Sequence, residues 1–124
     1  MGAGIAGLAP ARLLGEAGWH LVVVERSDEL REQGYMLDLF GPGFDAAEAM
    51  GLLPRLRELA YPVDEVSYVD HRGRQVAGLD YRRFASALGG RLLSLMRGDL
   101  EHALRESLGE RVELVFGRTG RRRR

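Results

Sequence analysis

Three glycines near the start of the chain have the spacing G-x-G-x-x-G, at Gly2, Gly4 and Gly7. They run directly into apolar residues at helical spacing, so the pattern predicts a tight turn followed by a helix. Such a turn can bind phosphates, because the first N–H groups of a helix point outward and the helix dipole adds partial positive charge. The first glycine permits the turn, the second lets the phosphates approach, and the third allows close packing of helix and sheet. We therefore predict a dinucleotide site formed by Gly2, Ala3, Gly4, Ile5, Ala6 and Gly7.

An acidic residue follows this helix at the end of a strand. Leu21 to Val24 form an apolar run typical of a buried strand, and Glu25 comes directly after it, 18 residues beyond Gly7. A carboxylate there can accept hydrogen bonds from the ribose hydroxyls of an adenosine, and its charge disfavours a 2′-phosphate. The alternative is a structural turn that binds nothing, since glycine-rich turns are common in a chain with 17 glycines.

The remaining patterns predict an α/β fold of alternating helices and strands. Residues 27–44 are polar and glycine-rich, which indicates a long loop with at most a short strand. Apolar residues on both sides of the turn at 70–73 alternate with polar ones and predict an antiparallel hairpin. The predicted elements after residue 44 are a helix over 46–59, the hairpin over 63–79, a strand over 92–96, a helix over 98–108 and a strand over 111–116.

One part of a Rossmann-like dinucleotide-binding sheet is missing from this pattern. The fingerprint has a strand immediately before the first glycine, and here only Met1 precedes it. That strand normally lies in the middle of the sheet, so we expect a parallel sheet that lacks its first strand and has exposed strand edges. A late start codon or a fragmentary gene would explain the gap.

Composition is that of one ordinary globular domain. The 124 residues are 45% hydrophobic and 29% charged, with no cysteine and no apolar stretch long enough for a membrane span, so we expect a soluble, cytoplasmic protein. The last four residues are all arginine, and without them 14 basic residues face 18 acidic ones, a net charge of −4. That balance argues against a nucleic-acid surface. We expect a partial cofactor-binding domain over residues 1–119 and a disordered basic tail over 120–124.

Three segments resemble one family of enzymes. GAGIAGLAPARLLGEAGWHLVVVER at residues 2–26 is similar to the FAD-binding opening of the para-hydroxybenzoate hydroxylase-like flavoprotein monooxygenases, which include aromatic hydroxylases and tetracycline-inactivating enzymes. GYMLDLFGPGFDAAEAMGL at 34–52 resembles the stretch after the ribose-binding acid. LMRGDLEHALRESL at 95–108 resembles the segment in which an arginine and an acid-leucine pair open a helix. Together the three segments cover most of the chain.

The resemblance implies an FAD-binding portion of a monooxygenase that hydroxylates an aromatic or polyketide-like small molecule. In this family NADPH or NADH reduces the flavin and molecular oxygen is the oxidant. The resemblance places Glu25 at the adenosine ribose, Arg97 at the flavin cofactor, and Arg26 and Arg31 near the cofactor, with the hairpin toward the substrate side. The family's Asp-Gly motif and its later Gly-Asp motif have no counterpart in this sequence, so the resemblance implies no catalytic residues here.

Two alternatives stay open at this point. The chain could be a non-catalytic remnant that cannot hold FAD, or another FAD- or NAD-dependent oxidoreductase that shares only the opening motif. Asp99 can be explained by its position at a helix start alone. The three histidines, His20, His71 and His102, are scattered without metal-like spacing, so we predict no metal site. Substrate, preferred nicotinamide and oligomeric state are not predicted.

Overall fold

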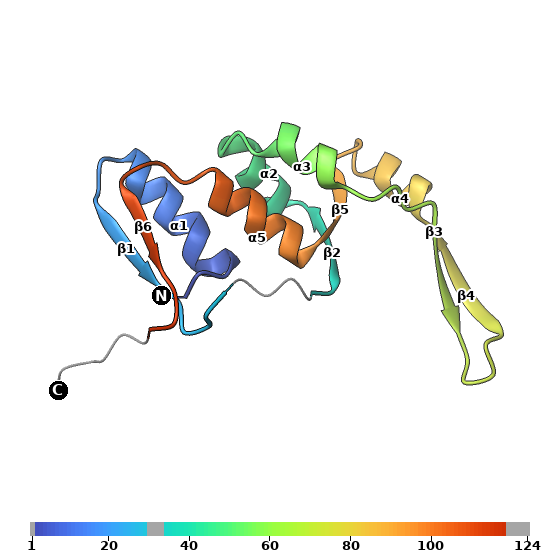
Figure 1. Cartoon of the computed structure of the whole chain (residues 1–124). Coiled ribbons are helices and arrows are strands. Elements are labelled where there is room, and N and C mark those ends of the chain that lie inside the picture. Colours follow the sequence, from blue (N-terminus) through green and yellow to red (C-terminus); the bar gives the residue numbers. More distant parts are fainter. Residues whose placement is uncertain (1, 30–33, 119–124) are drawn as a thin grey trace.

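The computed structural model describes residues 2–29 and 34–118, which form an α/β fold with parallel and antiparallel strand pairs (Figure 1). The predicted tail at 120–124 and Arg31 lie outside the described residues. The helices are α1 (Ile5–Glu16), α2 (Pro42–Ala49), α3 (Leu53–Leu59), α4 (Tyr81–Ala87) and α5 (Arg97–Glu106). The strands are β1 (Leu21–Val24), β2 (Met36–Phe40), β3 (Glu65–Val69), β4 (Gln75–Asp80), β5 (Leu92–Met96) and β6 (Val112–Val115).

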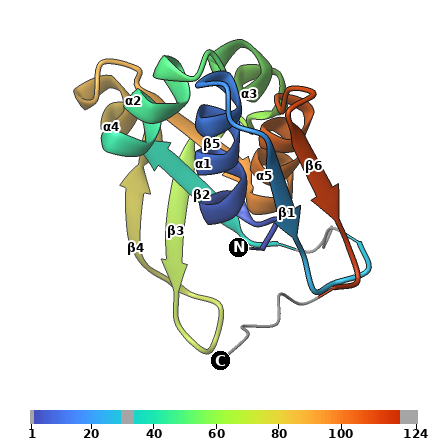
Figure 2. The same cartoon turned by 90° about the vertical axis from the view of Figure 1, so that its left-hand side faces the viewer.

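The first helix and the first strand form one unit with the last strand of the described chain. β1 pairs with β6 in parallel, from Leu21 opposite Val112 to Val24 opposite Val115, and α1 lies beside this pair (Figure 2). A β-carbon added to Gly15 would come within 2.8 Å of Val112 Cγ2, so this glycine is where the helix packs closely on β6. Gly18, with φ +96°, follows the helix as the sequence predicts.

A second strand pair joins β2, in the segment predicted as a loop with at most a short strand, to β5, where a strand is predicted. β2 pairs antiparallel with β5. Two helices, α2 and α3, follow β2 in the chain and precede the hairpin. The single helix predicted over 46–59 is wrong: α2 already begins at Pro42, and the chain breaks at Gly51, with φ +68°, before α3. Proline suits a first helical position because its missing N–H has no partner there, and glycine readily adopts the positive φ that ends the helix.

The predicted hairpin is present and projects from the rest of the fold (Figure 1). Its turn is held by the Asp70 carboxylate, which accepts hydrogen bonds from the backbone amides of Arg72 at 2.8 Å and Arg74 at 3.0 Å. Helix α4, which the sequence analysis did not predict, follows the hairpin directly. The Asp80 side chain caps it by accepting a hydrogen bond from the Arg83 amide at 3.1 Å.

A buried polar cluster joins α4 to the second sheet. The Tyr81 hydroxyl is hydrogen-bonded to Asp38 on β2 and lies 2.8 Å from Ser94 Oγ on β5, and Ser94 in turn donates to Asp38 at 2.8 Å. Burial and the Asp38 hydrogen bond raise the pKa of the Tyr81 hydroxyl above its ordinary value. The neutral hydroxyl is therefore the form held between the two strands.

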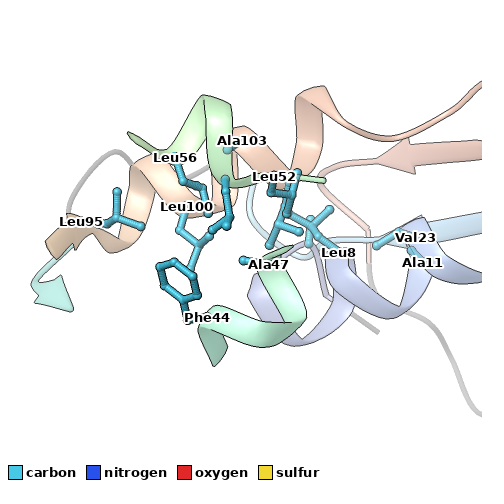
Figure 3. Close-up of a cluster of buried hydrophobic side chains, with 13 residues drawn as sticks. Leu8, Ala11, Val23, Phe44, Ala47, Leu52, Leu56, Leu95, Leu100 and Ala103 are labelled. Carbon is cyan, nitrogen blue, oxygen red and sulfur yellow. The ribbon is translucent and has the colours of Figure 1, made fainter. Parts of the chain in front are cut away.

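One hydrophobic core joins the β1–β6 pair, the β2–β5 pair and the helices between them (Figure 3). Leu8 of α1, Leu56 of α3 and Leu95 of β5 have no exposed surface. The other buried apolar residues of the core are Ala3, Ala11, Val23, Phe44, Ala47, Leu52, Leu53, Leu100, Ala103 and Leu104. Residues from distant parts of the sequence meet here, so the glycine turn and α5 are fixed relative to each other. Among the described residues no helix is long and apolar enough to cross a membrane.

Packing of α1 can be tested with two leucines of the same helix. Leu8 is fully buried, whereas Leu13 is 52% exposed. We expect Leu8→Ala to lower the free energy of unfolding by roughly 2–5 kcal/mol, because it leaves a cavity in the core. The matched control Leu13→Ala should change it by less than about 1 kcal/mol. Urea denaturation followed by circular dichroism measures both, and equal losses would contradict this packing.

Candidate cofactor-binding site

The glycine turn before α1 is closed so tightly that two of its positions exclude a side chain. A β-carbon on Gly7 would overlap the carbonyl oxygen of Gly2, and one on Gly2 would lie 2.7 Å from Glu25 Oε2. The roles expected for these glycines are therefore only partly right. Gly7 is required by the closure of the turn itself, and the close approach of helix to strand occurs at Gly15.

Glu25 ties this turn to the end of β1. Its carboxylate accepts a hydrogen bond from the Ser27 amide at 2.9 Å and one from the Ala3 amide at 2.8 Å. These bonds, first to Ser27 and then to Ala3, hold the pKa of Glu25 below its ordinary value of 4.5. The half-buried carboxylate is thus charged at neutral pH, and each oxygen keeps a lone pair for a further donor.

Arg97 approaches the same turn from the start of α5. Its backbone amide donates to the Tyr35 carbonyl at 3.0 Å, which fixes the end of β5 against the start of β2. A β-carbon on Gly34 would lie 3.2 Å from Arg97 Cβ, so glycine at 34 lets the two segments come close. The guanidinium Nη2 lies 2.7 Å from Glu101 Oε1, one helical turn further along α5. This pairing directs the cation toward Gly4.

A pocket of about 160 Å³ opens between these groups. Its lining residues come from the glycine turn, the end of β1 and the start of α5: Ala3, Gly4, Glu25, Arg26, Ser27, Glu29, Arg97 and Glu101. A pocket for a whole small-molecule ligand measures about 300–1,000 Å³. This pocket is therefore too small to enclose such a ligand whole.

The structure brings together some of the predicted site residues and leaves others aside. Five of them line the pocket: Ala3, Gly4, Glu25, Arg26 and Arg97. Gly2 and Gly7 shape the turn, and Ile5 and Ala6 begin the helix, where their amides have no acceptor within it. The position of Arg31 lies outside the described residues.

Sequence reasoning missed three lining residues, Ser27, Glu29 and Glu101. The signal for Glu101 was its spacing, because residues four apart lie on the same face of a helix, and Glu101 is four residues after Arg97. Nothing in the sequence distinguishes Glu29 from other exposed acids of the chain.

Asp99 and His102 both lie on α5. Asp99 lies in the first turn of α5, where its charge suits the helix dipole, but no side chain caps this helix. His102 pairs with Glu106 at 2.9 Å on the same helix. Within residues 2–29 and 34–118, no cluster of three acidic, histidine or cysteine side chains could hold a metal ion.

The fold defined by these elements is an α/β fold with a phosphate-sized pocket at the start of its first helix. Solved structures of enzymes superpose on this fold. p-Nitrophenol 4-monooxygenase from Pseudomonas putida superposes with a TM-score of 0.76 at 25% identity, covering 94% of this chain and 30% of that one. A tetracycline destructase superposes with a TM-score of 0.72 at 29% identity, covering 94% of this chain and 28% of that one.

Sequence comparison finds relatives of the same kind, although no protein-family profile matches the chain. The flavin-dependent monooxygenase eupH of a Phoma species is 38% identical over 83% of this chain and 24% of its own length. The 2-heptyl-3-hydroxy-4(1H)-quinolone synthase of Pseudomonas aeruginosa is 35% identical over 88% of this chain and 28% of its own length. An uncharacterised protein of Mycobacterium tuberculosis is 34% identical over 93% of this chain and 31% of its own length.

The chain is thus similar to one part of proteins that are named as flavin- or FAD-dependent monooxygenases. It spans about a quarter to a third of the length of the curated relatives that it matches. The predicted resemblance of the chain to flavoprotein monooxygenases is thereby confirmed.

The hydrogen bonds of Glu25 predict a specific pH dependence of stability. Because folding lowers the pKa of this carboxyl group, its charged form stabilises the fold above about pH 4.5, and this contribution is lost as the pH falls through the folded pKa. We expect Glu25→Gln to be less stable than the wild type at pH 7, with a gap that narrows below about pH 4.5. Denaturant unfolding at several pH values measures the gap, and a constant gap down to pH 3 would contradict the assignment.

Proposed function

We propose that this chain binds FAD and forms the cofactor-binding portion of a flavin-dependent monooxygenase. One observation carries the proposal: the amide-bearing start of α1, the Glu25 carboxylate and the Arg97 guanidinium all face one pocket. A dinucleotide offers a matching order of groups, namely ribose hydroxyls that donate hydrogen bonds and a pyrophosphate that carries negative charge.

The space at Gly4 supports this fit. A β-carbon there would meet Glu101 Oε1 at 3.6 Å and Arg97 Nη2 at 3.7 Å, which are ordinary contact distances, so nothing within the protein requires glycine at this position. A phosphate resting on the amides of the helix start would occupy the same space. Glycine at position 4 is thus explained by a ligand, in contrast to Gly2 and Gly7, which the turn itself requires.

We further propose that α1, β1 and β6 are part of a Rossmann-like sheet. β6 pairs with one edge of β1, and among the described residues no strand pairs with the other edge. The strand that precedes the glycine turn in that fold has its place at this free edge. Val22 of β1 is 60% exposed, as expected for a strand that another layer or neighbour would cover.

The activity that we propose for the whole protein is hydroxylation of an aromatic or polyketide-like small molecule with NADPH or NADH and molecular oxygen. Bound FAD supplies the redox chemistry of such a reaction. The residues described here hold and orient the cofactor: Glu25 binds the adenosine ribose, the turn binds the pyrophosphate, and Arg97 balances its charge. The hairpin of β3 and β4 is proposed to face the substrate, because it projects from the fold away from α1 (Figure 1).

Binding of FAD can be measured directly on the purified chain. We expect the protein to quench the fluorescence of added FAD, and Glu25→Ala to weaken binding about tenfold to a hundredfold, because hydrogen bonds to a charged group are lost. Glu113→Ala is the matched control, since Glu113 is an exposed acid on β6 that does not line the pocket. Folded protein that leaves excess FAD unbound would support the non-catalytic remnant instead.

Two glycine variants distinguish an effect on FAD binding from an effect on the stability of the turn. Gly4→Ala should unfold at nearly the same temperature as the wild type but bind FAD at least about tenfold more weakly, because its methyl group fills the phosphate space. Gly7→Ala should lower the unfolding temperature itself, because its methyl group overlaps the Gly2 carbonyl. Thermal unfolding and FAD titration measure both, and unaltered binding in Gly4→Ala would contradict the proposed phosphate position.

A further inference from the structure

Glu101 is a buried acid whose role the proposed cofactor site leaves unexplained. It lies on α5 among the buried residues Leu100, Ala103 and Leu104, and only 4% of it is exposed. Charged side chains are rarely buried to this degree unless their charge and their hydrogen-bonding atoms are satisfied. The burial of this carboxylate in an otherwise apolar face therefore requires partners.

Arg97 supplies only part of what Glu101 requires. The guanidinium Nη2 is 2.7 Å from Glu101 Oε1, so the charges are paired. Among the residues that the structure describes, however, Oε1 is closed to solvent and accepts no hydrogen bond of good distance and angle. Leaving a buried charged acceptor without a well-formed hydrogen bond is costly, so a further donor to this carboxylate would stabilise it.

The Glu101 carboxylate lies at the end of the turn opposite Glu25. Glu101 Oε1 would be 3.6 Å from a β-carbon on Gly4, and Glu101 lines the pocket together with Arg97. Glu25 Oε2, by comparison, lies beside Gly2. A dinucleotide with its adenosine ribose at Glu25 and its pyrophosphate on the turn would therefore bring its second half to Glu101.

We propose that Glu101 accepts a hydrogen bond from a hydroxyl group of the bound dinucleotide, on the side of the pyrophosphate away from the adenosine. This inference rests on the proposed FAD binding and names a further specificity residue for it. Charge alone would make a carboxylate unfavourable next to a pyrophosphate, because like charges repel. A hydroxyl donor reverses that effect, so Glu101 selects ligands that carry a polyol after the pyrophosphate, as FAD does, over ligands that end there, as ADP does.

The test compares the affinities for FAD and for ADP in variants of Glu101. Glu101→Met has a similar size but no strong acceptor, and we expect it to lower the ratio of FAD affinity to ADP affinity about tenfold. Glu101→Gln keeps an acceptor oxygen and should retain most of the wild-type ratio. Calorimetric titration gives both affinities, and thermal unfolding verifies that each variant folds. Should Glu101→Met not fold, Glu101→Ala takes its place as the variant without an acceptor.

Two controls make the outcomes distinct. Glu106→Gln alters an exposed acid of the same helix, paired with Arg55 outside the pocket, and should leave both affinities unchanged. Glu25→Ala should weaken FAD and ADP alike, because both carry the adenosine ribose. An unchanged ratio in the variant without an acceptor, or equal losses in it and in Glu101→Gln, would overturn the role of Glu101. Wild-type protein that binds neither ligand would overturn the proposed function and this inference with it.

Discussion

The hydrogen bonds of one carboxylate hold the candidate site in its shape. Glu25 joins the Ala3 amide, before α1, to the Ser27 amide, after β1, so the glycine turn cannot move independently of the strand end. The position of this turn determines where α1 begins, and therefore the direction in which the free amides of α1 point. The same carboxylate can serve structure and ligand together, because two backbone bonds leave about half of its lone-pair sites free.

The elements that could be predicted are those whose pattern is local. The glycine turn, α1, β1 and the hairpin are legible from glycine spacing, apolar periodicity and turn residues alone. The break between α2 and α3 could not be predicted, because a helix can tolerate a glycine such as Gly51. Only the packing on both sides decides that α2 ends there. The pairing of β1 with β6 joins residues about ninety positions apart, and no periodicity in either strand encodes its partner.

The site was predictable to the extent that a motif describes it. Glu25 follows from the spacing of a dinucleotide fingerprint, and Arg97 follows only from the family resemblance of its helix. Glu101 belongs to no such motif, and its spacing from Arg97 alone does not reveal its burial, because an acid within an amphipathic helix normally faces water. Its burial results from the contact between α5 and α1, which depends on the whole fold. Residues of this kind become visible only once the elements are assembled.

The polar cluster around Tyr81 is one of the contacts that join the hairpin to the strand leading to the candidate pocket. Tyr81 follows β4 directly and binds Asp38 and Ser94, which lie opposite each other in the β2–β5 pair. Ser94 is three residues before Arg97 on one continuous strand and helix start. A displacement of the hairpin is therefore transmitted, in part through the Tyr81 hydroxyl, to the strand that leads into Arg97.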